Sequence, residues 1–179
     1  NEVNSLMNAA TRRQQILELL RQTSQPLSAT AIASRFSVSR QIIVGDIALL
    51  RAAGEAITAT PRGYLLERPG GQPYVETRIV CEHGDDRLAE ELYTVVDLGG
   101  ALIDVTVEHS IYGQICAPLH VCSRFDADAF LQKLRAENAR PLCDLTGGIH
   151  LHLLRCPDLT VQARVLQALS EKGFLLLRE

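Results

Sequence analysis

The sequence predicts an α+β protein of two domains, and three observations support that class. Helical and strand-like spacings of apolar residues alternate along the 179 residues. A segment rich in proline and glycine, Arg68–Pro73, interrupts both patterns. The charge also changes there, because residues 8–68 carry eight basic residues against four acids, whereas residues 69–179 carry ten against sixteen. We therefore expect one domain over residues 8–68 and a second over residues 74–179, joined by a short linker.

Three short helices are expected in the N-terminal domain. Thr11 can cap the first, and Ser28 can cap the second after Pro26. Ser39 can cap a third helix that runs to Ala53, with a glycine where a C-terminal cap belongs. The positions of the third helix that share one face are Ile42, Ile43, Asp46, Ile47 and Leu50.

A tight turn, Ser37-Val38-Ser39, separates the second helix from the third. Residues 57–66 follow as two short β-segments around a Pro-Arg-Gly turn, which indicates a β-hairpin. Helices in this order, followed by a hairpin, predict a winged helix-turn-helix. The basic charge of this domain favours DNA as its partner, and a winged helix that binds proteins is the alternative.

The docking geometry of helix-turn-helix domains assigns roles to individual side chains. The first residues of the third helix enter the major groove, so Ser39, Arg40 and Gln41 are candidates for contacts to base edges. Arginine can bind guanine through two donors, and glutamine can bind adenine. The candidates for contacts to phosphate are Ser37, Arg51 and Arg62.

Strand and helix patterns alternate through the C-terminal domain. The expected strands are Val75–Cys81, Ala101–Val107, Gln114–Val121, Ile149–Leu154 and Phe174–Leu177. The expected helices are Asp85–Leu98, Asp126–Asn138 and Leu159–Lys172. This order predicts a mixed or antiparallel sheet with helices mainly on one side.

Four residues of the C-terminal domain form a candidate metal site. His150 and His152 stand two apart in an apolar strand, so their side chains lie on one face. His83 ends the first strand, and Glu91 flanks the buried stripe of the helix that follows. Three imidazoles and a carboxylate suit Zn²⁺, Ni²⁺, Fe²⁺ or Cu²⁺ better than Mg²⁺ or Ca²⁺. The alternative is a set of hydrogen-bonded histidines with an ordinary helix-edge acid.

The cysteine content and the hydropathy of the chain argue against several classes of protein. The five cysteines are odd in number and lack Cys-x-x-Cys spacing, which argues against a disulfide framework and a zinc ribbon. Cys81, two residues before His83, could lie near the same site, but its apolar neighbours favour simple burial. No apolar stretch is long enough to cross a bilayer, and no signal peptide is visible. We expect a cytoplasmic protein with reduced thiols and no membrane partner.

Several segments in combination resemble the niacin-responsive transcriptional repressor family, from about residue 10 to residue 178. Its helix-turn-helix is similar to VSRQIIVGDIALLRAAGEAITATPRGYLL, although Gly45 stands where a long polar residue is expected. Its three-histidine domain, "3H", is similar to EHGDDRLAEELYTVVDLGG, DVTVEHSIYGQI, PLHVCSRFDADAF and TGGIHLHLL. The resemblance implies a homodimer that represses genes of NAD biosynthesis or niacin uptake, with nicotinic acid as co-repressor. It also implies one divalent metal ion per chain on His83, Glu91, His150 and His152, with nickel or zinc favoured and iron an alternative.

Nicotinic acid is a planar pyridine with a carboxylate, and either group could complete the coordination of such a metal. We hypothesise that His109, Tyr112 and Arg124 contact this ligand or shape its pocket; a turn held by local hydrogen bonds is the alternative for the first two. Two other functions stay open. One is a regulator that senses the metal itself, and the other is a metal-dependent hydrolase fused to a DNA-binding module. No general base stands out, so we expect no enzyme.

Overall fold

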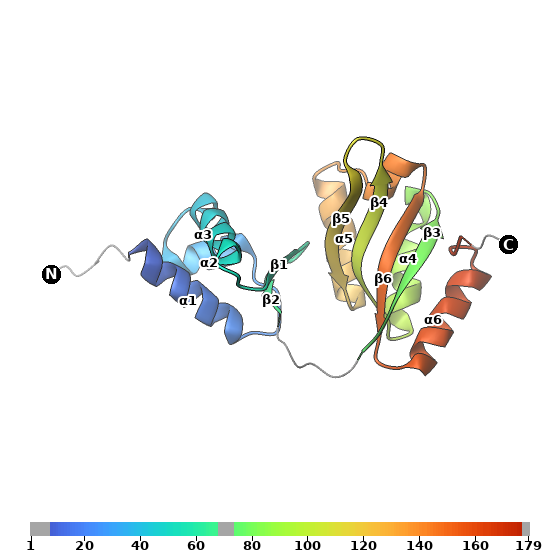
Figure 1. The fold of residues 1–179 in the computed structure, drawn as a ribbon, viewed down its shortest axis with the longest axis horizontal. Helices are drawn as coiled ribbons and strands as arrows, with labels where there is room; N and C mark the ends of the chain where they lie inside the picture. Colours follow the sequence, from blue (N-terminus) through green and yellow to red (C-terminus); the bar gives the residue numbers. More distant parts are fainter. Residues whose placement is uncertain (1–7, 68–73, 177–179) are drawn as a thin grey trace. The chain divides into compact units, whose positions relative to one another are not determined.

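The computed structural model describes residues 8–67 and 74–176, and the chain divides into two compact units between residues 70 and 71 (Figure 1). The expected linker, Arg68–Pro73, lies outside the described residues. None of the helices in the described ranges is both long enough and apolar enough to cross a membrane. The α+β class is confirmed, with helices and a hairpin in the first unit and an antiparallel sheet with helices in the second.

The N-terminal unit is a three-helix bundle with a hairpin wing. Its elements are α1 (Ala9–Arg21), α2 (Ala29–Phe36), α3 (Arg40–Ala52), β1 (Ile57–Thr60) and β2 (Gly63–Leu66). Ser28 and Ser39 cap α2 and α3 as predicted. The prediction that Thr11 caps α1 is wrong, because the Asn8 side chain accepts a hydrogen bond from the backbone N–H of Ala10 and the helix begins earlier. Asparagine caps helices at least as well as threonine, and the alanines between the two favour helix.

The core of this unit gathers apolar side chains from all three helices and β1. Ile43, Ile47 and Leu50 of α3 are buried, as the helical spacing predicts. Ile42 was expected to be buried with them, but it is 41% exposed. It lies about 100° around the helix from Ile43, beyond the edge of the buried stripe.

A buried carboxylate ties α3 to α1. Asp46 is only 4% exposed, and its side chain accepts a hydrogen bond of 2.6 Å from the Arg12 Nε atom. The Arg13 guanidinium lies 3.6 Å away and adds a second positive charge. A charged group buried among apolar residues is tolerated because it is paired, so this contact fixes how the two helices pack.

The C-terminal unit contains one four-stranded sheet in the order β3-β6-β4-β5, with antiparallel neighbours throughout. Its strands are β3 (Val75–Glu82), β4 (Ala101–His109), β5 (Gly113–Val121) and β6 (Ile149–Cys156). Its helices are α4 (Leu88–Asp97), α5 (Arg124–Ala136) and α6 (Leu159–Glu171), with 3₁₀ turns η1 (Asp85–Arg87) and η2 (Leu142–Thr146). The first expected helix therefore starts as a 3₁₀ turn.

The expected last strand, Phe174–Leu177, does not form in the described part of the chain. Leu175 makes a single bridge to Cys81, and Leu177 lies outside the described residues. The Phe174 side chain is fully buried in the core. The segment still pairs briefly with β3, because the Glu82 N–H donates to the Phe174 carbonyl and the Leu176 N–H donates to the Val80 carbonyl, each at 2.9 Å. An apolar run of this length can fill a core as well as pair in a sheet, and periodicity does not separate the two.

The three helices cover one face of the sheet, with α4 and α5 lying behind it in Figure 1. Buried side chains from all four strands and all three helices form a single core there. Alternate residues of β6 point into this core, and they are His150, His152, Leu154 and Cys156. The sheet therefore places two imidazoles on its helix-covered side.

We expect Asp46→Asn to destabilise the N-terminal unit by about 3 kcal/mol, because it removes the partner of a largely buried arginine. Glu18→Gln is the matched control, since its ion pair with Arg21 is exposed and such pairs contribute at most about 1 kcal/mol. Urea unfolding read by amide hydrogen exchange in residues 8–67 isolates this unit. Equal effects of the two substitutions would contradict a structural role for Asp46.

Candidate functional site

Strand β6 positions the two histidines against β3. In the antiparallel register, Cys81 lies opposite His150, and Ile79 lies opposite His152. Before the strand begins, Gly148 passes so close to His83 that a Cβ on it would lie 2.7 Å from the His83 carbonyl oxygen. This contact places the end of β3, with His83, beside the start of β6.

Helix α4 supplies the acid from the opposite side. Its inward face carries Leu88, Leu92 and Val95, and Glu91 falls on this same face with 0% exposure. The Glu91 Oε2 atom lies 2.8 Å from the Nε2 atom of His83. It lies 3.5 Å from Nε2 of both His150 and His152. The structure thus brings together the four residues that the sequence proposes as metal ligands, all of them 7% exposed or less.

Backbone carbonyls orient all three imidazoles. Each Nδ1 atom faces a backbone oxygen, at 2.8 Å from Gly84 for His83, 2.8 Å from Gly148 for His150, and 2.6 Å from Asp104 for His152. A carbonyl only accepts hydrogen bonds, so each Nδ1 carries the proton that it donates. In the neutral ring, the Nε2 lone pair then points toward Glu91. This arrangement is the outer-shell support that metal-binding histidines normally have.

The centre of the cluster contains two buried polar atoms whose hydrogen-bonding capacity is unused. Among the described residues, Glu91 Oε1 and His152 Nε2 are buried without a hydrogen-bond partner. Three lone pairs and a carboxylate that face one another without water repel, unless a proton or a metal ion lies between them. The donor set therefore fits a divalent cation.

The pKa values of Glu91, His83 and His152 also favour positive charge within the cluster. Burial would raise the pKa of Glu91, but the nearby imidazoles of His152, His150 and His83 hold that pKa well below its ordinary value. Burial lowers the pKa values of His83 and His152, and Glu91 outweighs it, so both pKa values are raised. The carboxylate therefore stays ionised at neutral pH, and positive charge beside it is favoured.

The thiol of Cys81 belongs to this cluster, although its sequence context suggested simple burial. Its sulfur, a carboxylate oxygen of Glu91 and a ring nitrogen of His150 all lie within 4.8 Å of one another. Burial and the Glu91 charge raise the pKa of the thiol. The two-residue spacing from His83 hinted at this position, but only the pairing of β3 with β6 establishes it.

The residues proposed to contact the effector do not come together within one chain. His109 and Tyr112 lie at the β4–β5 turn, where the His109 ring accepts hydrogen bonds from two backbone N–H groups and Tyr112 is 76% exposed. Arg124 begins α5 and forms two hydrogen bonds of 2.6 Å with Asp97. The length of β5, about 27 Å at the usual rise per residue, separates Arg124 from the turn.

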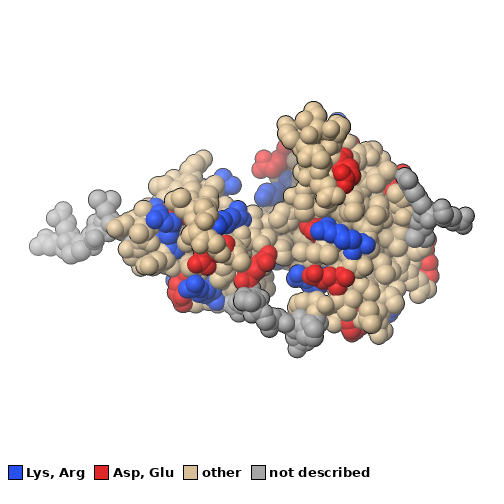
Figure 2. Space-filling view, viewed as in Figure 1, with Lys and Arg blue, Asp and Glu red and all other residues tan. Residues whose placement is uncertain are grey.

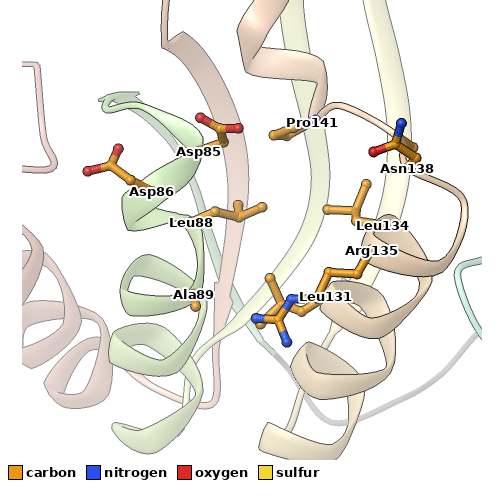
Figure 3. A pocket seen from close by; sticks show the side chains of 10 residues that line it. Asp85, Asp86, Leu88, Ala89, Leu131, Leu134, Arg135, Asn138 and Pro141 are labelled. Atoms are coloured by element: carbon orange, nitrogen blue, oxygen red, sulfur yellow. The ribbon is translucent and has the colours of Figure 1, made fainter.

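A hollow of about 440 Å³ opens between α4 and α5 (Figure 3). Leu88 and Ala89 line it on one side, and Leu131 and Leu134 line it on the other. Charged side chains, Asp85, Asp86 and Arg135, also border it. His109, Tyr112 and Arg124 are absent from its walls. The sequence offers no local sign of this hollow, because two helices distant in the chain form it.

The first residues of α3 are exposed to solvent, as contacts with DNA bases require. Arg40 and Gln41 are exposed, whereas Ser39 is engaged as the helix cap. Basic side chains are visible at several places on this unit in Figure 2. Ser37 adopts the left-handed conformation that ends α2, which places it in the turn. A Cβ on Gly45 would meet no atom within 4 Å, so this helix face has room for the side chain that glycine lacks.

Two arginines proposed for phosphate contacts also have intramolecular partners. Arg51 Nε donates a 2.7 Å hydrogen bond to the Ile57 carbonyl, and its guanidinium lies 5.6 Å from the Tyr64 ring centroid. Arg62 donates to the Gln25 side chain at 2.7 Å. Arg51 therefore holds the wing against α3, and its charge sits where α3 and the wing meet.

Two family models match the chain, an HTH domain over residues 12–65 and a 3H domain over residues 76–178. The chain is 39% identical over 165 residues to a Thermotoga maritima protein called "Probable transcription repressor NiaR", covering 92% of this chain and 93% of that protein. It is 40% identical over 169 residues to a Bacillus subtilis protein called "Transcription repressor NadR", covering 93% and 94%. These similarities span both units.

We expect Gly148→Ala to weaken Zn²⁺ binding by about 10- to 100-fold, the usual effect of disturbing the support of a metal ligand. A Cβ there would press on the His83 backbone. Gly147→Ala is the matched control, because that residue also has positive φ but its Cβ would meet no atom within 4 Å. Competition titration with a zinc indicator measures both, and equal weakening would contradict the proposed contact.

Arg40→Ala and Gln41→Ala should each lower affinity for a duplex selected from a random library by about 1–3 kcal/mol and relax preference at one base pair. Arg164→Ala, which removes an exposed arginine of α6, should leave affinity unchanged. Fluorescence anisotropy on the selected duplex and its single-base variants gives both quantities. Uniform weakening across all sequences would instead place the two side chains on phosphates.

Proposed function

The chain belongs to the NiaR/NadR family of transcription repressors, and we propose that it binds operator DNA in response to nicotinic acid. The single observation that carries the effector and metal part is the buried cluster of His83, Glu91, His150 and His152. Its Nε2 atoms converge on the Glu91 carboxylate, and Glu91 Oε1 and His152 Nε2 have no hydrogen-bond partner among the described residues. This cluster shares the chain with an exposed DNA-reading helix. The resemblance described above names nicotinic acid as co-repressor.

A divalent transition metal ion fits the donor set of the cluster. The Nε2 atoms of the three histidines and the Glu91 carboxylate would hold it, with nickel or zinc favoured and iron an alternative. When bound, the metal would act as a Lewis acid that accepts a lone pair from the pyridine nitrogen or the carboxylate of nicotinic acid. The side chains of all four ligands are at most 2% exposed, so a ligand would reach the metal only after a local rearrangement.

Co-repression requires that the ligand binds more tightly to the form that binds DNA. In a homodimer, two α3 helices about 34 Å apart would enter successive major grooves, and ligand binding would favour that spacing. His109, Tyr112 and Arg124 remain candidates for effector contacts, and two copies in a dimer could bring their distant positions together. A repressor of this kind acts on DNA in the cytoplasm.

A metal-responsive regulator is the second candidate, and the burial of the cluster favours it. Four protein ligands in a closed site can satisfy a tetrahedral ion without any small molecule. In that case the metal itself would be the effector. DNA binding would then respond to metal at fixed nicotinate.

Thermal unfolding tests the effector. Nicotinic acid at about 100 times its dissociation constant should stabilise metal-loaded protein by about 2.7 kcal/mol, and chelator-stripped protein should not respond. Nicotinamide, which lacks the carboxylate, is the control ligand. Stabilisation by metal alone, with no response to nicotinic acid, would favour the metal-responsive regulator.

The double variant His150→Ala with His152→Ala should lose nicotinate-dependent DNA binding, because half of the proposed ligands are gone. Its binding to DNA without nicotinate should stay at the level of the parent protein, since α3 lies in the other unit. Anisotropy titrations with and without nicotinate measure both. An undiminished response in the variant would overturn the role of the metal.

A further inference from the structure

The proposed function leaves one buried thiol beside the metal cluster unexplained. Cys81 is fully buried, and its position opposite His150 in the β3–β6 pair puts both side chains on the same face of the sheet. Its sulfur lies within 4.8 Å of donor atoms of both Glu91 and His150. Nitrogen and sulfur ligands of one tetrahedral zinc ion are about 3.6 Å apart, so a shift of about an ångström brings this sulfur to ligand spacing.

A second observation shows that the cluster around this thiol is built for a cation. Glu91 Oε1 and His152 Nε2 are both buried without a partner among the described residues. Cys143 and Cys156 are buried too, but neither belongs to the group of converging donors found there. Cys156 lies opposite Val75, at the other end of the strand from His150. Cys81 is thus the thiol that the sheet directs to this site.

We propose that the Cys81 sulfur is a further ligand of the metal ion and biases the site toward thiophilic ions such as Zn²⁺, Ni²⁺ and Co²⁺ over Mn²⁺. The inference rests on the proposed function, because it assumes that the histidine–glutamate cluster binds metal. When the metal–sulfur bond forms, the thiol proton is released to solvent, and no oxidant or reductant is needed. Sulfur donors favour these ions, whereas oxygen donors suit manganese.

Cobalt substitution of the full-length protein tests the ligand directly. Co²⁺ bound to the histidine–glutamate cluster gives visible d–d bands, and a bound thiolate adds a near-ultraviolet sulfur-to-cobalt charge-transfer band. We expect both in the parent protein. Cys81→Ala and Cys81→Ser should lose the charge-transfer band and keep d–d bands, whereas the matched control Cys156→Ser should keep both.

The outcomes separate this inference from the proposed function. Visible bands without the charge-transfer band in the parent protein would overturn the role of Cys81 and leave the metal site standing. A charge-transfer band that persists in Cys81→Ala would assign it to another thiol and also overturn the inference. No cobalt-dependent absorption at all would overturn the metal site, and the inference with it.

Two further measurements cover the case in which a variant fails to fold. Zinc X-ray absorption on the parent protein should require a sulfur scatterer at about 2.3 Å in addition to nitrogen and oxygen. In a variant that folds, the ratio of Zn²⁺ to Mn²⁺ affinity should fall by about 10- to 100-fold. A shell of only nitrogen and oxygen, or an unchanged ratio, would overturn the assignment.

Discussion

The C-terminal unit depends on one buried carboxylate, Glu91, which lies in contact with three imidazoles. An ionised carboxylate without water costs several kcal/mol unless positive charge compensates it. The three histidines provide that compensation only by holding protons or by sharing a cation. Packing α4 against the sheet therefore requires positive charge beside Glu91, which apolar contacts alone do not provide.

The surrounding structure is organised to keep this cluster in place. Backbone carbonyls from three different segments fix the imidazole rings, so their orientation is set by the fold and not by the side chains themselves. Gly148 allows β6 to begin in direct contact with His83. Because the sheet and helix are both rigid elements, the donor atoms are preorganised before any ligand arrives.

The N-terminal unit meets a similar requirement with different chemistry. Asp46 is also buried, but Arg12 neutralises it directly, so that carboxylate has no need of an external cation. The contrast separates an acid that is paired within the chain from one whose proposed partner is a metal ion. A buried acid paired with arginine holds two helices together, whereas a buried acid surrounded by histidines has the donor set of the proposed metal site.

Much of this protein could be predicted from local sequence. The caps at Ser28 and Ser39, the hairpin wing and the shared face of His150 and His152 follow from short-range spacing, because helix and strand periods act within a few residues. The inward turn of Glu91 follows from the same helical period.

Tertiary structure decided what depends on distant segments. It placed Cys81 opposite His150, separated Arg124 from His109 by the length of β5, and buried the Phe174 side chain beside the end of β3. It also selected the imidazole nitrogens that face Glu91. Strand register and side-chain protonation are set by contacts between segments far apart in the chain, and no local pattern of residues encodes them.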